Sequence, residues 1–169
     1  MKPFLLKFLS FMLLGILLTQ CDDDPQSKIT GTVIDRSQCK NFLAGKNEKF
    51  TVSDTFSSVE YNYSLSLHRL TLNHINAAFN CCPDEIYCQI EISGDTIHIY
   101  EMEETSACDC NCLYDITEQL NNVIPGTYII QYHEPYIGNQ PALIFQLQLS
   151  EDCNGIFSVP RTSYPWGIL

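Results

Sequence analysis

The chain has 169 residues, and its 20 acidic side chains against 9 basic ones give a formal net charge of −11. So acidic a surface repels nucleic acid and anionic lipid headgroups, which excludes nucleic-acid binding as a function. The length suits one domain that is large enough to bury a core. The sequence contains no internal repeat and no low-complexity tract.

Residues 1–20 have the features of a lipoprotein signal peptide. Lys2 and Lys7 give it a positive start, and an apolar run follows over residues 8–18. This run is too short to cross a bilayer of about 30 Å as a helix. It ends at Leu-Thr-Gln-Cys21, which resembles a bacterial lipobox except that Gln20 replaces the usual small residue. We expect cleavage before Cys21 and lipidation of Cys21; an ordinary signal peptide is the alternative.

Residues 21–27 form an acidic tether, with aspartates at positions 22–24. An acidic run in this place resembles the surface-export signal of lipoproteins from the Bacteroidetes group, and a plain solvated linker explains it equally well. Loss of residues 1–20 leaves seven basic against 20 acidic side chains, a net charge of −13. Attached lipid chains hold a protein on a membrane without a spanning helix. We therefore expect an extracytoplasmic domain, residues 28–169, on the outer membrane or the cell surface.

Short segments rich in β-branched and aromatic residues alternate with turn signals over residues 28–169, which predicts strands throughout. Ser93-Gly94-Asp95 is the clearest hairpin signal, and a break in alternation at His68-Arg69 predicts a turn or bulge. No helix of convincing length is expected. The expected strands cover residues 28–34, 50–56, 58–63, 64–79, 86–92, 96–103, 113–116, 128–132, 141–150 and 156–159.

The stretch from Val123 to Tyr128 contains a Pro-Gly turn followed by a tyrosine. It resembles the tyrosine corner of immunoglobulin-like and fibronectin-like sandwiches, in which the hydroxyl bonds back to the backbone. The expected fold is all-β: an antiparallel, immunoglobulin-like β-sandwich stapled by disulfides. The tail, residues 163–166, is expected to fold back on the body.

Eight cysteines remain once Cys21 is lipidated: Cys39, Cys81, Cys82, Cys88, Cys108, Cys110, Cys112 and Cys153. Outside the cytosol such an even set favours disulfides. In an extended strand the triplet at 108, 110 and 112 points to one face with spacings of about 6.6 Å, which excludes bonds within the triplet. We expect three bonds between the triplet and the set at 81, 82 and 88, together with Cys39–Cys153.

Zinc binding by His74, Cys82, Cys110 and Cys112 is the alternative for the cysteine-rich band, although no C-x2-C spacing is present. Carboxylates near the band leave a weak calcium site open. We expect His74 to be a hydrogen-bonded structural residue rather than a ligand.

Glu101, Glu103 and Glu104 offer a candidate carboxylate pair for acid–base chemistry, and Glu101 and Glu103 share one strand face, but a solvated strand end explains them better. No motif for a reaction, a metal or a phosphate group is present. The sequence therefore predicts no catalytic residue, no cofactor and no enzymatic activity.

Two segments, residues 72–83 (LNHINAAFNCCP) and 108–115 (CDCNCLYD), look like parts of small uncharacterised lipoproteins of the Bacteroidetes group. The resemblance implies membrane attachment and an extracytoplasmic domain, and it implies no activity. We expect a lipid-anchored binding or structural module with a protein or glycan ligand. The alternative function is a metal-binding or thiol-redox lipoprotein that uses the cysteine-rich band.

Overall fold

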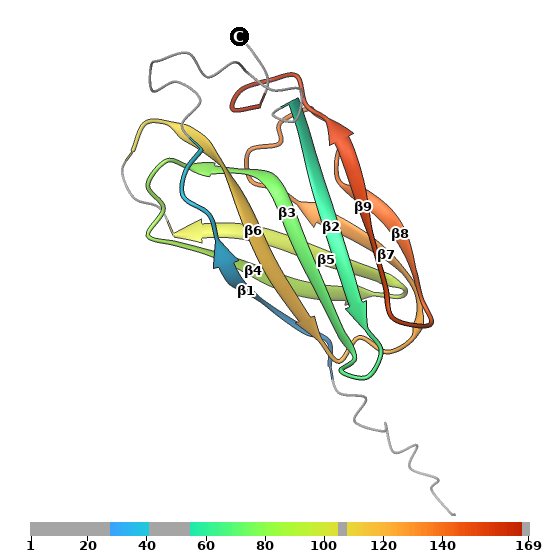
Figure 1. Ribbon diagram of the computed structural model, residues 1–169. Coiled ribbons are helices and arrows are strands. Elements are labelled where there is room, and N and C mark those ends of the chain that lie inside the picture. Colours follow the sequence, from blue (N-terminus) through green and yellow to red (C-terminus); the bar gives the residue numbers. More distant parts are fainter. Residues whose placement is uncertain (1–27, 41–54, 105–107, 167–169) are drawn as a thin grey trace, which may run out of the picture.

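The computed structural model describes residues 28–40, 55–104 and 108–166 (Figure 1). The expectations for the signal peptide, the tether, Cys21 and most of the strand at 50–56 lie outside these ranges. The described residues form nine strands: β1 (Thr30–Arg36), β2 (Phe56–Ser64), β3 (Arg69–Asn80), β4 (Glu85–Ser93), β5 (Thr96–Glu104), β6 (Asn111–Asn121), β7 (Gly126–His133), β8 (Ile144–Leu149) and β9 (Cys153–Pro160). Within the described ranges there is no helix, and so none that could span a membrane.

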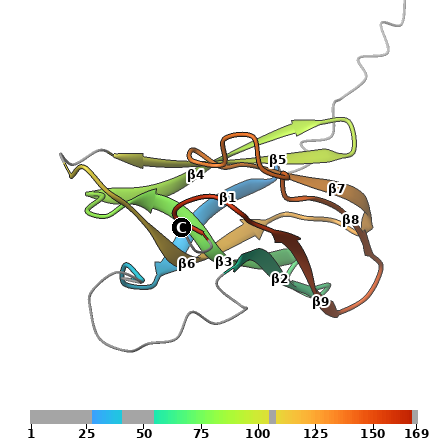
Figure 2. The ribbon, with the colours of Figure 1, turned by 90° about the horizontal axis from the view of Figure 1, so that it is seen from above.

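The strands form two sheets that lie face to face (Figure 2). One has five strands in the order β1-β6-β3-β2-β9, and the other has four in the order β4-β5-β7-β8. All paired strands are antiparallel except β5 and β7, which are parallel. The all-β prediction and the two-layer sandwich are thereby confirmed, and β5 is an interior strand of its sheet, as its two partly apolar faces predict.

Local sequence explains the hairpins and one bend. Gly94 has a φ of +62° in the turn between β4 and β5, a conformation that glycine adopts without a steric cost. The break at His68 is the turn between β2 and β3, where His68 itself has a φ of 46°. Asn76 has a φ of 63° and causes a register shift between β3 and β6. This bulge bends β3 and shifts the alternation of the residues that follow it, so that a different set of their side chains faces inward.

Two apolar clusters fill the space between the sheets. The larger is built from alternating positions such as Leu70, Leu72, Ile97, Ile99 and Leu120, all fully buried. The smaller lies further along β3 and β6, at Ala77, Phe79, Ile86, Cys112, Tyr114 and Ile116. Burial of such side chains supplies most of the stabilising free energy of a sandwich.

The turn and the tail behave as their sequences predict. The hydroxyl of Tyr128 donates a hydrogen bond of 2.9 Å to the carbonyl of Ile124, at the point where the chain crosses from β6 in one sheet to β7 in the other. This is the hydrogen bond of a tyrosine corner. In the tail Trp166 is fully buried, and its Nε1 donates to the carbonyl of Asn76 at 2.6 Å. The tail therefore does fold back on β3.

Candidate functional site

A layer of buried ionisable side chains separates the two apolar clusters. Each of its five members is less than 7% exposed: His74, Glu101, Glu118, Glu134 and Arg161. Strand alternation explains why they point inward. His74 follows Leu70 and Leu72 on one face of β3, and Glu101 follows Ile97 and Ile99 in the same way on β5. We call these five residues the charged layer.

His74 lies at the centre of the charged layer. Its Nδ1 is 2.6 Å from Oε1 of Glu101, and its Nε2 is 2.7 Å from the Oγ of Ser57 on β2. The edge of the Tyr132 ring packs against it at 5.1 Å between ring centroids. Burial lowers the pKa of His74, and burial also raises the pKa of Glu101 to about 8. At neutral pH the two therefore form an uncharged pair joined by one shared proton.

Arg161 and Glu134 form the ion pair of the layer. Nη2 of Arg161 donates to both carboxylate oxygens, at 2.7 and 2.6 Å, and Nη1 donates to the carbonyl of Pro141 at 2.5 Å. The guanidinium also lies over the ring of Trp166, at 4.9 Å from its centroid. Burial raises the pKa of Glu134, and the positive charge of Arg161 opposes that effect. One guanidinium nitrogen thus makes charge-assisted hydrogen bonds to both carboxylate oxygens, while the other terminal nitrogen serves the backbone.

Glu118 extends the layer toward β4. Its Oε2 accepts a hydrogen bond of 2.7 Å from the hydroxyl of Tyr132. Burial, and then the neighbouring Glu101, raise the pKa of Glu118 to about 8. Burial, followed by the charge of Glu118, also raises the pKa of the Cys88 thiol. Cys88 is therefore a neutral thiol at physiological pH, and a poor nucleophile.

Ser57, His74 and Glu101 are ordered as in the nucleophile, base and orienting carboxylate of a serine hydrolase. A nucleophile must also reach a substrate carbonyl, and Ser57 is fully buried. None of the three surface hollows described below is lined by any of the three residues. The arrangement can hold and exchange a proton in the interior, but it does not offer Ser57 to a substrate.

Three disulfides lie at one end of the sandwich, where they pack against the smaller apolar cluster and include its member Cys112. They join Cys81 to Cys110, Cys82 to Cys108 and Cys39 to Cys112, with Cα–Cα distances of 5.5, 6.1 and 5.8 Å. The prediction that the triplet does not bond within itself is confirmed, and so are two bonds between the two predicted sets. The pairing is set by register, because Phe79 lies opposite Cys112, and Lys40 bridges to Leu113.

The predicted Cys39–Cys153 bond is wrong, and so is the pairing of Cys88. Cys153 begins β9 opposite Tyr63, which is paired with Leu70, whereas Cys112 is opposite Phe79. From residue 70 to residue 79 an extended strand spans roughly 30 Å, so Cys39 and Cys153 are at opposite ends of the sandwich. Cys88 points from the middle of β4 toward Glu118 instead. Cys88 and Cys153 both remain thiols.

The alternative metal set is also contradicted. Cys82, Cys110 and Cys112 each belong to a different disulfide. Both ring nitrogens of His74 are hydrogen-bonded in the interior, which confirms the prediction that His74 is structural. Among the described residues no group of three or more His, Cys, Asp or Glu side chains is arranged to hold a metal.

The expectation of a solvated carboxylate pair is wrong for Glu101, whereas Glu103 is half-buried near the end of β5. Glu101 is 3% exposed and bonded to His74. Glu103 accepts hydrogen bonds from the backbone N of Asn80, at 2.8 Å, and from the hydroxyl of Tyr136, at 2.5 Å. The alternation of Ile97, Ile99 and Glu101 could have shown that Glu101 faces the core; the preference of a carboxylate for water argued against it.

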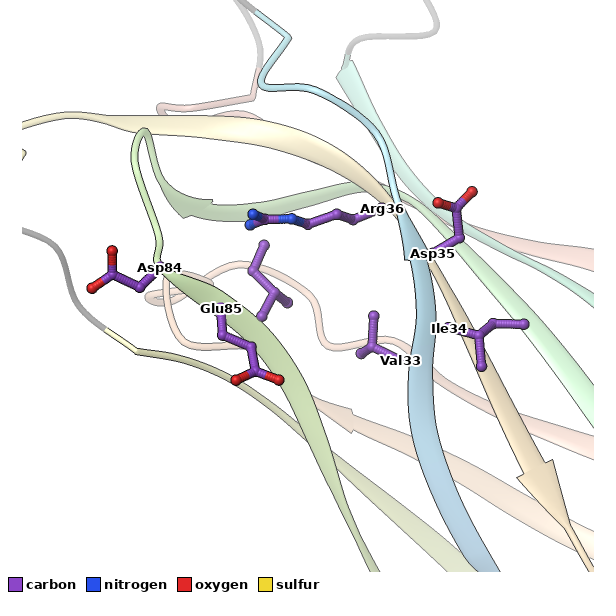
Figure 3. Close-up of a pocket in the computed structure, with 7 residues that line it drawn as sticks. Val33, Ile34, Asp35, Arg36, Asp84 and Glu85 are labelled. Atoms are coloured by element: carbon purple, nitrogen blue, oxygen red, sulfur yellow. The ribbon is translucent and has the colours of Figure 1, made fainter.

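Two hollows lie near the disulfide end. One, of about 310 Å³, lies between β1 and the start of β4 and is shown in Figure 3. In this hollow the side chain of Arg36 extends from β1 toward the side where Asp84 and Glu85 lie, whereas Asp35 points to the opposite side of β1 (Figure 3). The other, of about 220 Å³, is lined by residues 36–39, Cys81, Cys82, Pro83 and Tyr114. Solvated carboxylates around a single arginine do not define a ligand.

The third hollow, of about 440 Å³, lies on the outer face of the five-stranded sheet. Its lining is mostly uncharged and polar: Glu60, Tyr61, Asn62, Thr71, Asn73, Asn154, Gly155 and Ile156. The pairing register extends this polar surface across the sheet. Thr32 pairs with Gln119, Gln119 with Thr71, Thr71 with Asn62, and Asn62 with Asn154. We call these five residues the polar row; sequence reasoning missed it because it spans strands that are distant along the chain.

The outer face of the four-stranded sheet carries a different group. His98 on β5 and His133 on β7 approach each other, with 3.1 Å between Nδ1 of His98 and Nε2 of His133. The ring of Tyr100 stacks on that of His133 at 4.1 Å between centroids. No spacing in the sequence indicates this pair, since it depends on the parallel pairing of β5 with β7.

Comparison of the chain with models of known protein families, with curated proteins and with solved structures finds no match in any of the three. The case for a function is therefore made from the described geometry and from the sequence.

Proposed function

We propose that this protein is a lipid-anchored, extracytoplasmic β-sandwich that binds a neutral glycan on the outer face of its five-stranded sheet. The observation that carries the proposal is the polar row, which crosses all five strands from Thr32 to Asn154. The solvated face of an antiparallel sheet is usually polar, and the feature that favours a ligand on this face is the hollow of about 440 Å³ that Asn62, Thr71 and Asn154 of the row line.

The chemistry of the polar row favours a sugar. Side-chain amides and hydroxyls both donate and accept hydrogen bonds, as the hydroxyl groups of a glycan require. The hollow beside the row adds Asn73, which donates to Glu60 at 3.3 Å, and Ile156, which is 60% exposed and offers apolar contact to a ring. The net charge of −11 disfavours an anionic polysaccharide, so the expected ligand is uncharged.

A protein ligand is the second option and has less support. The centres of protein interfaces are enriched in aromatic residues, methionine and arginine. The polar row contains none of these residues. A row of amides and hydroxyls offers little apolar area for a protein partner to bury.

The proposed location depends on the cysteines. Three disulfides in one small domain are typical of an oxidising compartment.

The lipobox-like sequence before Cys21 supplies the proposed anchor. Cys21→Ser should release the protein from membranes, and a fatty-acid analogue should label the unaltered chain alone. Unchanged membrane retention of the variant would remove the lipoprotein proposal.

The proposed likeness to immunoglobulin-like domains is confined to the corner at Tyr128. Those domains place the first strand beside the second, whereas β1 pairs with β6 here. We propose that the two share only the tyrosine corner, which fixes the crossing of the chain from one sheet to the other. We propose no closer relation.

Glycan binding can be tested with the detergent-solubilised, full-length protein on an array of neutral polysaccharides from cell envelopes. The variant Asn62→Ala/Thr71→Ala/Asn154→Ala should lose binding. The matched control is Gln146→Ala/Gln148→Ala, which removes exposed amides from β8 on the opposite outer face and should bind normally. Equal binding by the triple variant and the control would exclude the polar row as the ligand surface.

The runner-up function, metal binding or thiol redox chemistry by the cysteine-rich band, makes a different prediction. It requires free thiolates among Cys82, Cys110 and Cys112. A thiol titration of the unfolded, unreduced protein should instead find two thiols, at Cys88 and Cys153. Five or more thiols would favour the runner-up.

A further inference from the structure

Two histidines, His98 and His133, lie side by side on the outer face of the four-stranded sheet. Tyr100 and His133 occupy paired positions on β5 and β7, and His98 is paired with Gln131, so the two histidines are diagonal neighbours. Both side chains are half-buried at a solvent-facing surface. Their facing nitrogens are 3.1 Å apart, and at that distance at least one ring must be neutral.

This separation is close to that of two ligands on one metal ion. Zinc binds histidine nitrogens at 2.0–2.1 Å in tetrahedral geometry, which places two such nitrogens about 3.3 Å apart. The rings are inclined by 37° and lie on an open face, so a small rotation of the His98 ring lets both lone pairs converge on one ion. The shared proton of the present pair is then replaced by the metal.

The surroundings favour a cation at this position. Glu91, paired with His98 across β4 and β5, hydrogen-bonds the hydroxyl of Tyr100. Burial and the neighbouring His98 lower the pKa of His133, and the charge of Glu91 opposes them. The His133 ring is thus held neutral and ready to ligate, beside a carboxylate that balances positive charge. The stack with Tyr100 fixes the orientation of the His133 ring.

We infer that His98 and His133 form a two-histidine binding site for a divalent transition-metal ion, with solvent completing the coordination and Glu91 balancing the charge. The ion is of the class that prefers imidazole, such as Zn²⁺ or Cu²⁺. This site is separate from the cysteine-rich band and from the polar row. It does not depend on the proposed glycan function.

The test is calorimetric titration of the full-length, detergent-solubilised protein with Zn²⁺ alone, in a Cys88→Ser/Cys153→Ser background that removes both free thiols. Loss of a ligand should cost at least as much as loss of an outer-shell partner, so His98→Gln and His133→Gln should each weaken binding by about tenfold or more. The control is His68→Gln, which changes an exposed histidine in the β2–β3 turn and should leave binding unchanged.

A second measurement guards against variants that fail to fold. In the unaltered protein, Zn²⁺ should shift the imidazole NMR signals of His98 and His133 and leave those of the buried His74 unchanged. Binding should also weaken between pH 7.5 and 5.5, because protons compete for the imidazoles. Undiminished affinity in both His98→Gln and His133→Gln, or unchanged signals of both rings at saturating Zn²⁺, would overturn the inference.

Discussion

The larger apolar cluster and the charged layer are neighbours between the same two sheets, but they are held together differently. In the cluster, residues such as Leu72 and Ile99 contact other apolar side chains and have no polar requirement to meet. In the layer, His74, Glu101 and Arg161 each depend on a particular partner atom. Apolar contacts tolerate rearrangement, whereas a buried charge without its partner is strongly destabilising.

The contrast extends to the conditions under which each region is stable. Burial of apolar area does not change with pH, so the cluster should contribute equally across the physiological range. The layer contains two carboxyl groups, Glu101 and Glu118, whose pKa is raised to about 8. Its contribution to the free energy of unfolding must therefore depend on pH. The four predictions below test how different parts of the fold contribute to its stability, in order from the largest expected effect to the smallest.

Arg161→Met should destabilise the fold by about 3–5 kcal/mol, because it leaves Glu134 charged and unpaired in the interior. The measurement is the free energy of unfolding in urea. The double variant Glu134→Gln/Arg161→Met removes both charges and should recover a large part of the loss. Leu72→Ala serves as the comparison in the apolar cluster. It should lower the free energy of unfolding by about 2–5 kcal/mol, and no single second substitution should restore the lost stability. An Arg161→Met variant as stable as the unaltered protein would contradict the account of the layer.

Removal of the Cys39–Cys112 disulfide as the Cys39→Ser/Cys112→Ser variant should cost about 2–4 kcal/mol. The matched variant Cys81→Ser/Cys110→Ser should cost less, since that bond spans a sequence separation of 29 residues and the first spans 73. The physical reason is that a longer loop loses more conformational freedom when it is closed in the unfolded chain. Denaturant unfolding compares the two variants, and the reverse order would argue against the entropic account.

Stability should fall between about pH 6.5 and 8 because of Glu101 and Glu118. Below their unfolded pKa, near 4.5, both states hold these protons; at higher pH the unfolded chain releases them while the folded chain keeps them until about pH 8. His74 acts in the opposite sense, because its lowered pKa costs stability as pH falls below about 6.5. Glu134 is raised in the same direction as the two carboxyls, and Arg161 opposes that rise.

The expected loss across the window from pH 6.5 to 8 is about 3 kcal/mol, since each of the two carboxyls contributes up to about 1.4 kcal/mol per pH unit and the slope decreases as pH approaches 8. The variant Glu101→Gln/Glu118→Gln replaces both acids by neutral amides and should flatten the profile there. Unfolding curves at several pH values give the comparison. A profile that is as steep in the variant as in the unaltered protein would show that other groups cause the dependence.

Tyr128→Phe should cost about 1 kcal/mol, the usual net value of one hydrogen bond, because it removes the bond to the carbonyl of Ile124 and leaves the ring in place. Tyr87→Phe is the control, since Tyr87 is 37% exposed on the outer face of β4. Thermal unfolding distinguishes a lowered midpoint in the first variant from an unchanged one in the second. Equal midpoints would mean that the corner does not stabilise the crossing from β6 to β7.

Much of the fold could be predicted from the sequence because strands and turns are local features. Alternation and β-branched residues identified the strands at 86–92 and 96–103, and Gly94 identified the turn between them. The segment at 113–116 was expected to be short, yet β6 runs from Asn111 to Asn121. Its later half includes Glu118, a residue type that is seldom placed inside a sheet. Its hydrogen bonds with Tyr132 and Cys88 help to make that position favourable.

The candidate sites were less predictable, because they join residues that are distant along the chain. His98 and His133 are unremarkable in the sequence, and the parallel pairing of β5 and β7 brings them within 3.1 Å. The polar row requires the order of five strands, in which β6 is inserted between β1 and β3. Likewise, no spacing could show that the partner of Glu134 is Arg161.

The sequence by itself determined the all-β class, the turn near His68, the hairpin at residues 93–95 and the exclusion of bonds within the cysteine triplet. These follow from the rise and alternation of an extended chain, which act between near neighbours. The tertiary structure decided that Cys112 bonds Cys39 instead of Cys88, and that five ionisable side chains are buried together. Strand order decides which side chains that are distant along the chain come into contact. Hydrogen bonds and ion pairs between such side chains can offset the free-energy cost of removing them from water.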